Sequence, residues 1–489
     1  MSEALIWGAV VFYLLAALGV AWYSRSGPAT DMAGFFLGNR QMGGVLSALS
    51  YSATTYSAFM MVGLAGLTYA GGVGAFGFEI LYFAGVSLVA VFGPRFWAVG
   101  RHFGFVSPGE MLGTRYESRA VAVTVTLASC LFLIPYAAVQ LAGVGYLLSG
   151  MSGDAISFTT GVLVATVLAL VFVSIAGIRS VMWTDALQAL FMIAAATLVT
   201  VLVVATLGGP GTLFSRLAET RPEALSVPGG GTFSLVNFLG LTLPWFFFSL
   251  SNPQVSQRLF MPRSLDAMRR MLLVFLLFGF VYTLVTVLWG FSALVAFPDL
   301  EAADLATPTL LASNYVPPLL GAIVMVGILA AAVSTIDSIM LTLASMVARD
   351  VQGATVRSEA RQLATGKWVM PVIALLALVF AELRLDLIAV LSVASSTGLV
   401  VTVPAIVGAF FWRRGTAAGT LASVGIAGAL VLVAFATGYR PLGLPAGLWG
   451  LPLAALIFVL TSLATRPPQG AEAFIDISRG RSTQAAAGR

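Results

Sequence analysis

The sequence predicts an all-α integral membrane protein with about thirteen transmembrane helices. Of its 489 residues, 59% are hydrophobic and only 9% are charged, whereas an ordinary soluble protein carries about a quarter charged residues. Too few polar side chains remain to cover a water-facing surface, so lipid must be the solvent. One cysteine and one histidine exclude a disulfide framework and the common zinc motifs. With no long extramembrane segment, we expect a protein that is not an enzyme.

Thirteen apolar stretches are each long enough to cross the ~30 Å hydrocarbon core. Each is bounded by charged residues, glycine or proline. The first stretch has neither a positively charged leader nor a small-residue cleavage site, so we expect it to remain in the protein. The first seven spans are expected at 5–23, 43–70, 73–98, 120–149, 157–178, 184–207 and 232–254. The other six are expected at 270–297, 316–349, 366–383, 386–412, 416–437 and 445–465.

Basic residues predict the orientation of these spans. With the N-terminus outside, the inside loops and tail hold 21 of the 25 basic residues. Inside loops of membrane proteins are enriched in arginine and lysine. We therefore expect a multi-pass protein of a prokaryotic inner (cell) membrane with a cytoplasmic C-terminus. The outside loops hold only Arg216, Arg221, Arg384 and Arg440.

Three acidic residues, Glu79, Asp185 and Asp337, fall inside the hydrocarbon part of the predicted spans, while every arginine and the single lysine fall outside the hydrocarbon, in loops or near span ends. An ionised carboxylate at the bilayer centre costs at least ~2.5–3.5 kcal/mol, so such a residue has a partner or a function. With no basic side chain expected beside them, the acids must be protonated, face water or bind a mobile cation.

Hydroxyl side chains gather in the second and ninth spans. On a helix, Ala331, Ser334, Thr335 and Ser338 share one face because they follow i, i+3, i+4 spacing. Hydroxyls and free carbonyls are oxygen ligands that suit a hard ion such as sodium. The alternative is that these hydroxyls only join helices, which is common in membranes.

Several motifs together resemble the solute:sodium symporter family, which includes proline, pantothenate, sialic acid and sugar carriers. The resemblance runs from FFLGNRQMGG (35–44) to FFWRRG (410–415) and thus covers nearly the whole chain. Its most specific pieces between these are SPGEMLGTRY (107–116), GIRSVMWTDALQ (177–188), NPQVSQR (252–258) and AAAVSTIDSIM (330–340).

The resemblance implies a LeuT-like five-plus-five inverted repeat with discontinuous helices that meet at the midplane. It makes 1–465 a single transporter domain. Within it, 5–23 is an extra N-terminal helix, 43–207 the first repeat, 232–412 the second repeat and 416–465 a pair of C-terminal helices. The composition of 466–489 predicts a disordered cytoplasmic tail.

The resemblance also implies the site residues. The principal sodium site would comprise Ala53, Tyr56, Ala331, Ser334 and Thr335. A second sodium or proton site would comprise Asp185, Asp337 and Ser338; two carboxylates at one site would titrate as a pair, so a proton could replace a sodium ion. The solute site would comprise Ser57, Glu79, Tyr136, Gln140, Trp245, Ser249 and Ser396.

These residues indicate a sodium-coupled symporter that imports a small organic solute, such as proline, pantothenate or another small carboxylate, by alternating access. Two alternatives stay open: a sodium/sugar-type symporter, for which Glu79 is typical, and a transporter-like sensor module. An intramembrane hydrolase built on Asp185 and Asp337 lacks the expected surrounding motifs. Sodium, the solute and lipid are the expected partners, with no nucleic acid and no obligatory protein partner.

Overall fold

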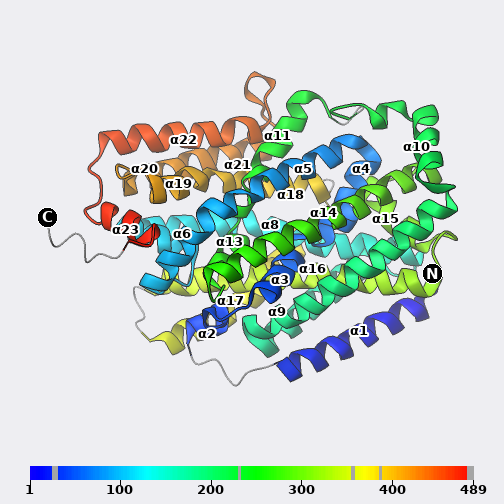
Figure 1. The fold of residues 1–489 in the computed structure, drawn as a ribbon, viewed down its shortest axis with the longest axis horizontal. Helices are drawn as coiled ribbons and strands as arrows, with labels where there is room; N and C mark the ends of the chain where they lie inside the picture. Colours follow the sequence, from blue (N-terminus) through cyan, green and yellow to red (C-terminus); the bar gives the residue numbers. More distant parts are fainter. Residues whose placement is uncertain (25–30, 230–232, 354–357, 385–387, 482–489) are drawn as a thin grey trace.

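The computed structural model describes residues 1–24, 31–229, 233–353, 358–384 and 388–481. Within these ranges the only regular elements are helices, and one isolated bridge joins Met42 and Pro262. Most long helices run roughly along the longest axis of the molecule and pack side by side (Figure 1). Four of the basic residues used to predict the orientation lie outside what the structure describes. They are Arg25, Arg357 and Arg489, together with the side chain of Arg179.

The helices of the first half follow the predicted spans, except that the fifth and sixth spans, expected at 157–178 and 184–207, form one continuous helix, α9 (Phe158–Thr206). Caps define several of their ends: Ser107 accepts a hydrogen bond from the Glu110 N–H at the start of α7, and Ser157 does the same for Thr160 in α9. The elements are α1 (Glu3–Ser24), α2 (Met32–Leu37), α3 (Gly44–Thr55), η2 (Phe59–Leu64), α4 (Ala65–Gly71), α5 (Val73–Val86), α6 (Leu88–Phe103), α7 (Pro108–Arg115), α8 (Arg119–Ser152), α9 (Phe158–Thr206) and α10 (Gly209–Thr220).

The second half contains more short pieces than the first. Its elements are α11 (Leu235–Phe246), α12 (Phe248–Ser251), α13 (Pro253–Ser256), η4 (Gln257–Phe260), α14 (Leu265–Ala296), η5 (Ala303–Leu305), α15 (Ala306–Ala312), α16 (Pro318–Met346), η6 (Val347–Gln352), α17 (Glu359–Glu382), α18 (Ile388–Leu399), η7 (Val400–Thr402), α19 (Val403–Phe411), α20 (Ala417–Ala422), η8 (Ser423–Ala427), α21 (Gly428–Thr437), α22 (Ala446–Ala464) and α23 (Ala471–Ser478). Short 3-10 turns also occur at Gly38–Arg40, Pro222–Leu225 and Pro441–Gly443.

Ten helices in the described ranges are long and apolar enough to cross a membrane. Three shorter apolar helices, Phe59–Gly71, Phe158–Val173 and Leu235–Phe246, lie in the predicted spans 43–70, 157–178 and 232–254. The all-α membrane architecture is therefore confirmed, whereas the exact number of thirteen spans stays a prediction.

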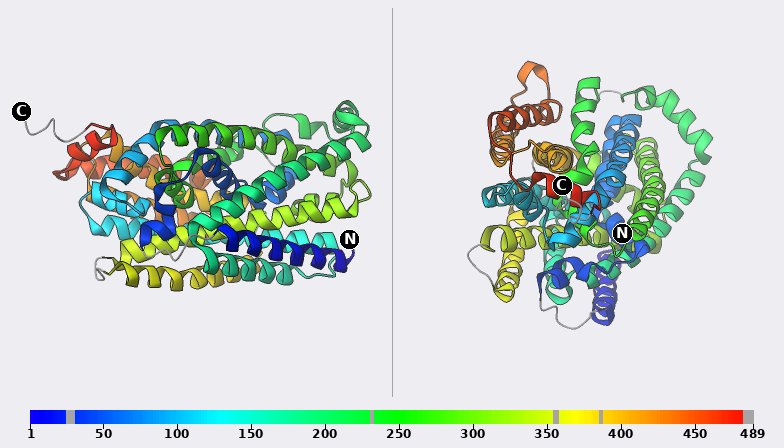
Figure 2. Two further views of the ribbon diagram at one scale, coloured as in Figure 1. Left: turned by 60° about the horizontal axis from the view of Figure 1, so that its bottom comes forward. Right: turned by 60° about the vertical axis from the view of Figure 1, so that its left-hand side comes forward.

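Helix α16 forms the centre of the bundle. It is buried along most of its length and packs against α9, α3 and α8. Helices α1 and α22 lie on opposite sides of the bundle (Figures 1 and 2). The predicted ninth span thus lies beside the predicted second, fourth, fifth and sixth spans.

Two of the predicted spans are broken inside the bundle. The second span leaves the α-helix after Thr55 and continues as the π-helical η2. The seventh span changes direction at Phe247 and again at Asn252, giving three short pieces before Phe260. These interruptions agree with the discontinuous helices that the sequence predicts.

The C-terminal tail differs from the prediction. We expect 466–489 to be disordered, yet residues 471–478 form α23, whose Phe474 and Ile475 are buried. Phe474 stacks on Phe103 with ring centroids 5.7 Å apart. This apolar contact gives the segment a surface to fold on, which a composition-based expectation of disorder does not consider. Helix α23 lies at the end of the bundle opposite to the N-terminus (Figure 1); residues 482–489 lie outside the described residues.

Candidate functional site

The break in the second span exposes backbone carbonyls at the centre of the bundle. Helix α3 ends at Thr55, and Tyr56 has φ −91° and ψ 74°, outside the helical region. The last carbonyls of an α-helix lack partners within that helix. Ala53 and Thr54 belong to this last turn, so their oxygens are available to a ligand or to a neighbouring side chain.

Thr335 of α16 reaches these carbonyls. Its Oγ1 lies 3.3 Å from the Ala53 carbonyl oxygen, 3.2 Å from that of Thr54 and 3.0 Å from that of Ala331. A hydroxyl has one proton and donates one hydrogen bond, so three acceptors around it are more than it can satisfy. The group of four oxygens is suited to a hard cation. The structure thus brings together the predicted residues Ala53, Ala331 and Thr335 and adds Thr54.

The other two predicted members of the principal site are arranged differently. Ser334 points to the neighbouring acid, and its hydroxyl donates to Asp185 Oδ1 at 2.6 Å. Tyr56 lies at the break itself, and its ring stacks on Phe275 of α14 with centroids 5.1 Å apart. Ligation of sodium through the Tyr56 carbonyl and the Ser334 hydroxyl stays a prediction.

Asp185 has a basic partner, which corrects the expectation that no intramembrane cation is present. Arg258 is 4% exposed, and its Nη2 lies 3.6 Å from Asp185 Oδ2. The Ser50 hydroxyl donates to the same carboxylate oxygen at 2.7 Å. The expectation fails because it placed Arg258 in a cytoplasmic loop after 254, whereas the broken seventh span carries it as η4 into the buried core.

Ser338 and Asp337 extend this cluster along α16. The Ser338 hydroxyl accepts from Arg258 Nη2 at 2.5 Å and lies 3.0 Å from Thr54 Oγ1. Asp337 is buried, and its Oδ1 has no hydrogen-bond partner among the described residues. The three residues predicted for a second site are therefore close in the fold, but Asp185 and Ser338 are already joined through Arg258.

The predicted solute residues are all buried. Trp245 Nε1 lies 3.4 Å from Glu79 Oε2, which links the broken seventh span to α5. The Trp245 ring packs on Phe59 and Phe248, with centroids 4.8 and 4.6 Å apart. These contacts form an aromatic wall beside the break in the second span.

Hydroxyl and amide groups face this wall from several helices. Tyr136 packs on Phe248 with centroids 5.8 Å apart, and the elements that carry Tyr136, Ser249 and Ser396 contact one another. In the described part of the chain, no hydrogen bond of ordinary geometry satisfies the following buried atoms: Tyr136 Oη, Gln140 Oε1, Ser249 Oγ and Ser396 Oγ. Buried polar atoms normally have a partner, so unsatisfied atoms gathered beside an aromatic wall suit a polar ligand. Ser57 lies at the break and accepts a hydrogen bond from the Phe59 N–H at 3.2 Å.

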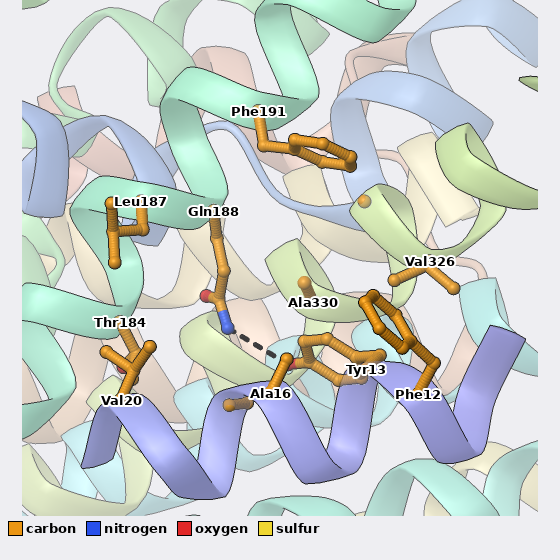
Figure 3. Close-up of a pocket in the computed structure, with 12 residues that line it drawn as sticks. Phe12, Tyr13, Ala16, Val20, Thr184, Leu187, Gln188, Phe191, Val326 and Ala330 are labelled. Carbon is orange, nitrogen blue, oxygen red and sulfur yellow. Dashed lines mark hydrogen bonds between the residues drawn. The ribbon is translucent and has the colours of Figure 1, made fainter. Parts of the chain in front are cut away.

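A separate hollow of about 290 Å³ lies on the outer side of the bundle, between α1, α9 and α16. It adjoins the cation cluster formed by Asp185, Arg258 and Ser338. Phe12 and Tyr13 of α1, Gln188 of α9 and Val326 of α16 line the hollow (Figure 3). Gln188 lies three residues after Asp185 in the sequence. Its Nε2 donates a hydrogen bond to Tyr13 Oη at 3.0 Å. The lining of the hollow is almost entirely apolar, so it is not the solute site that the polar residues indicate.

Sequence reasoning missed Arg258, the most important addition to the site. A signal was present: Arg258 follows Pro253 by five residues in NPQVSQR, and proline breaks or kinks a helix. A basic residue was one way to neutralise Asp185, but spacing alone could not show that a residue beyond the predicted span lies beside it.

Comparisons with known proteins identify the family of this chain. Residues 35–428 match the profile of the Sodium:solute symporter family. The chain is 25% identical to the sodium/pantothenate symporter of Escherichia coli (strain K12), with 94% of this chain and 97% of that protein covered. It is also 25% identical to the osmoregulated proline transporter OpuE of Bacillus subtilis (strain 168), over 93% and 94% of the two chains.

Solved structures confirm the predicted fold class. The substrate-bound outward-open state of a Na+-coupled sialic acid symporter matches with a TM-score of 0.78 at 18% identity, covering 95% of this chain and 98% of that chain. MhsT in complex with L-phenylalanine matches with a TM-score of 0.54 at 14% identity, covering 86% and 99%. Given the match over residues 35–428, the chain belongs to the sodium:solute symporter family, whose members are transporters and not enzymes.

Proposed function

We propose that this symporter uses the sodium gradient to import a small carboxylate, such as proline, pantothenate or a short monocarboxylate. The observation that carries the sodium part is the convergence of Thr335 Oγ1 with the carbonyl oxygens of Ala53, Thr54 and Ala331. Sodium prefers oxygen ligands of this kind, and a broken helix supplies them in transporters.

Sodium at this position would join the second span to the ninth span. Ala53 and Thr54 belong to α3, whereas Ala331 and Thr335 belong to α16. An ion drives a conformational change only if it binds one form more tightly than the other. A site shared by two helices that separate during transport meets this condition, because the ligand set is complete in only one arrangement. We infer that sodium favours the outward-open form and completes the solute site.

The solute part rests on the aromatic wall and the unsatisfied polar atoms. Trp245 and Phe248 offer an apolar surface, while Gln140 Oε1 and Ser396 Oγ lack partners among the described residues and Ser249 lies beside the Tyr51 and Tyr82 hydroxyls. Basic side chains are absent from the predicted solute set, and the nearby Arg258 is engaged by Asp185. A solute carboxylate would therefore bind backbone N–H groups at the helix breaks or lie beside the sodium ion. The related pantothenate and proline transporters support this solute class.

One sodium ion provides enough free energy for strong accumulation. A potential of 100 mV contributes ~2.3 kcal/mol per charge, and a tenfold sodium gradient adds ~1.4 kcal/mol. Together these allow a solute gradient of roughly several hundredfold.

The orientation is part of the proposal. The N-terminus would face the outside and the C-terminus the cytoplasm of a prokaryotic inner membrane, because arginines gather on one side of the spans. The start of α1 and helix α23 lie at opposite ends of the bundle, which supports termini on opposite sides (Figure 1). For Asp337, whose Oδ1 has no hydrogen-bond partner among the described residues, we propose a bound proton.

Uptake by purified protein in proteoliposomes tests the function. Labelled proline, pantothenate, pyruvate and glucose would each be offered with an inward sodium gradient, with sodium on both sides, or with potassium alone. We expect one carboxylate to accumulate only with the sodium gradient. Accumulation of glucose instead would establish the sugar-type alternative, and sodium-independent uptake would contradict the coupling.

A further inference from the structure

Arg258 occupies the place where the sequence predicts a second cation. Its Nη2 lies 3.6 Å from Asp185 Oδ2 and 2.5 Å from Ser338 Oγ, and its Nη1 lies 2.6 Å from Ser50 Oγ. Asp185 and Ser338 are two of the three residues expected to bind a second sodium ion or a proton. The guanidinium therefore contacts the same oxygens that a mobile ion would need.

The arginine is held firmly in this position. It comes from η4, after the bends at Phe247 and Asn252 in the seventh span. A guanidinium is planar and always charged, so it presents its donors in a fixed fork. Ser50 accepts a hydrogen bond from Arg258 and donates one to Asp185 Oδ2 at 2.7 Å. The oxygens of Asp185 and Ser338 that a mobile ion would need thus already accept hydrogen bonds from other residues of the protein.

A sodium ion could not share this space with the arginine. Both would use the oxygens of Asp185 and Ser338, so their charges would lie only a few ångströms apart, and like charges at that distance repel strongly inside a protein. The Thr335 oxygen cluster is different, because the hydrogen bonds of Arg258 in the described structure go to Ser50 and Ser338 and not to Ala53, Thr335 or Ala331. The position beside Asp185 and Ser338 is therefore taken by the Arg258 guanidinium, whereas the Thr335 cluster is open to a sodium ion.

We propose that Arg258 is a tethered cation that fills the second cation site, so that the protein binds one sodium ion. This inference rests on the proposed function, because it assumes that sodium binds at the Thr335 cluster. Removing the guanidinium while keeping Asp185 would open the second position to a mobile ion. Lysine would keep a charge at the position, whereas glutamine would not.

Direct binding of ²²Na⁺ to the purified full chain in detergent tests the proposal without any solute. We expect one ²²Na⁺ per wild-type protein, and about two per protein for Arg258→Gln, which is a twofold rise. Arg258→Lys should stay at one. The double variant Arg258→Gln with Asp185→Asn should return to one, because the second position then lacks its carboxylate.

Two outcomes overturn the inference. Two sodium ions bound to wild-type protein would show that the arginine does not fill the site, and this result needs no variant to fold. A folded Arg258→Gln protein that still binds one ion would also overturn it, with a single melting transition as the check of folding. Wild-type protein that binds no sodium would instead contradict the proposed function, so the two failures are distinguishable.

Discussion

The Asp185–Arg258 ion pair and the solute region are both buried, but their polar groups are satisfied in opposite ways. Asp185 is paired with Arg258 and accepts hydrogen bonds from Ser50 and Ser334. In the solute region, Glu79 has the long contact with Trp245, and within the described residues Ser396 Oγ and Gln140 Oε1 lack a hydrogen-bond partner. A fully satisfied network is rigid, whereas unsatisfied groups lower their free energy when a ligand arrives. The difference indicates that the first region holds the fold and the second waits for solute.

The largest expected effect comes from Asp185→Asn. The substitution leaves Arg258 buried without a countercharge, and breaking a buried ion pair costs about 3–5 kcal/mol. We expect a clear fall in the melting temperature of the purified protein, measured in detergent. Asp266→Asn is the matched control, since Asp266 and Arg269 form a pair that is 81% and 80% exposed and is worth at most ~1 kcal/mol. Equal shifts for both variants would contradict the comparison.

The next effect in size concerns sodium. The double variant Ser334→Ala with Thr335→Ala removes two hydroxyls from the predicted ligand set, and a hydrogen bond or ligand to a charged group is worth about 1.5–3 kcal/mol. We expect the sodium concentration for half-maximal uptake to rise at least ~10-fold, as each tenfold corresponds to ~1.4 kcal/mol. Insertion into the membrane should be normal.

Thr166→Ala serves as the control for this experiment. Thr166 is also buried, but its hydroxyl donates to the Val162 carbonyl of its own helix. Its sodium dependence should equal that of wild type. Unchanged sodium dependence in the double variant would show that the principal site lies elsewhere.

A smaller effect is expected for Ser249→Ala. Because its hydroxyl has no partner of ordinary geometry in the described structure, its removal should change the free energy of unfolding by less than ~1 kcal/mol. Solute half-saturation should rise roughly fivefold, since a lost hydrogen bond to solute costs about 1 kcal/mol. Ser392→Ala, whose hydroxyl donates to the Ile388 carbonyl, should leave solute half-saturation unchanged. A large loss of stability without a change in solute half-saturation would reverse the assignment.

The smallest effect on stability is expected for Glu79→Gln, which makes the same acid-to-amide change as Asp185→Asn. The amide oxygen can still accept from Trp245 Nε1, and within the described residues Glu79 forms no ion pair that the substitution would break. We expect a shift in melting temperature well below that of Asp185→Asn, together with altered preference among proline, pantothenate, pyruvate and glucose in competition assays. A fall as large as that of Asp185→Asn would show that Glu79 has a structural partner.

Much of the fold could be predicted because apolar length determines which segments enter a membrane. The long spans at α8, α14 and α16 follow directly from this rule. The oxygen cluster of Ala53, Ala331 and Thr335 was also predictable, through helical spacing and the resemblance. Arg258 was not, because a hydropathy pattern ends a span before the first charge and cannot show that the next residues are still buried. Helix α23 was missed for a related reason: its binding surface, formed by Phe103 and other residues distant in sequence, exists only after folding.

Helix α23 has a practical consequence for anyone who labels or shortens this protein. Its Phe474 lies against Phe103 of α6 and Phe410 of α19, and Glu472 pairs with Arg413 at 2.9 Å. A truncation before Ala471 would leave these aromatic rings bare at the bundle end. A fluorescent reporter joined after Ser478 would move together with α6 and α19 and report on their displacement during turnover.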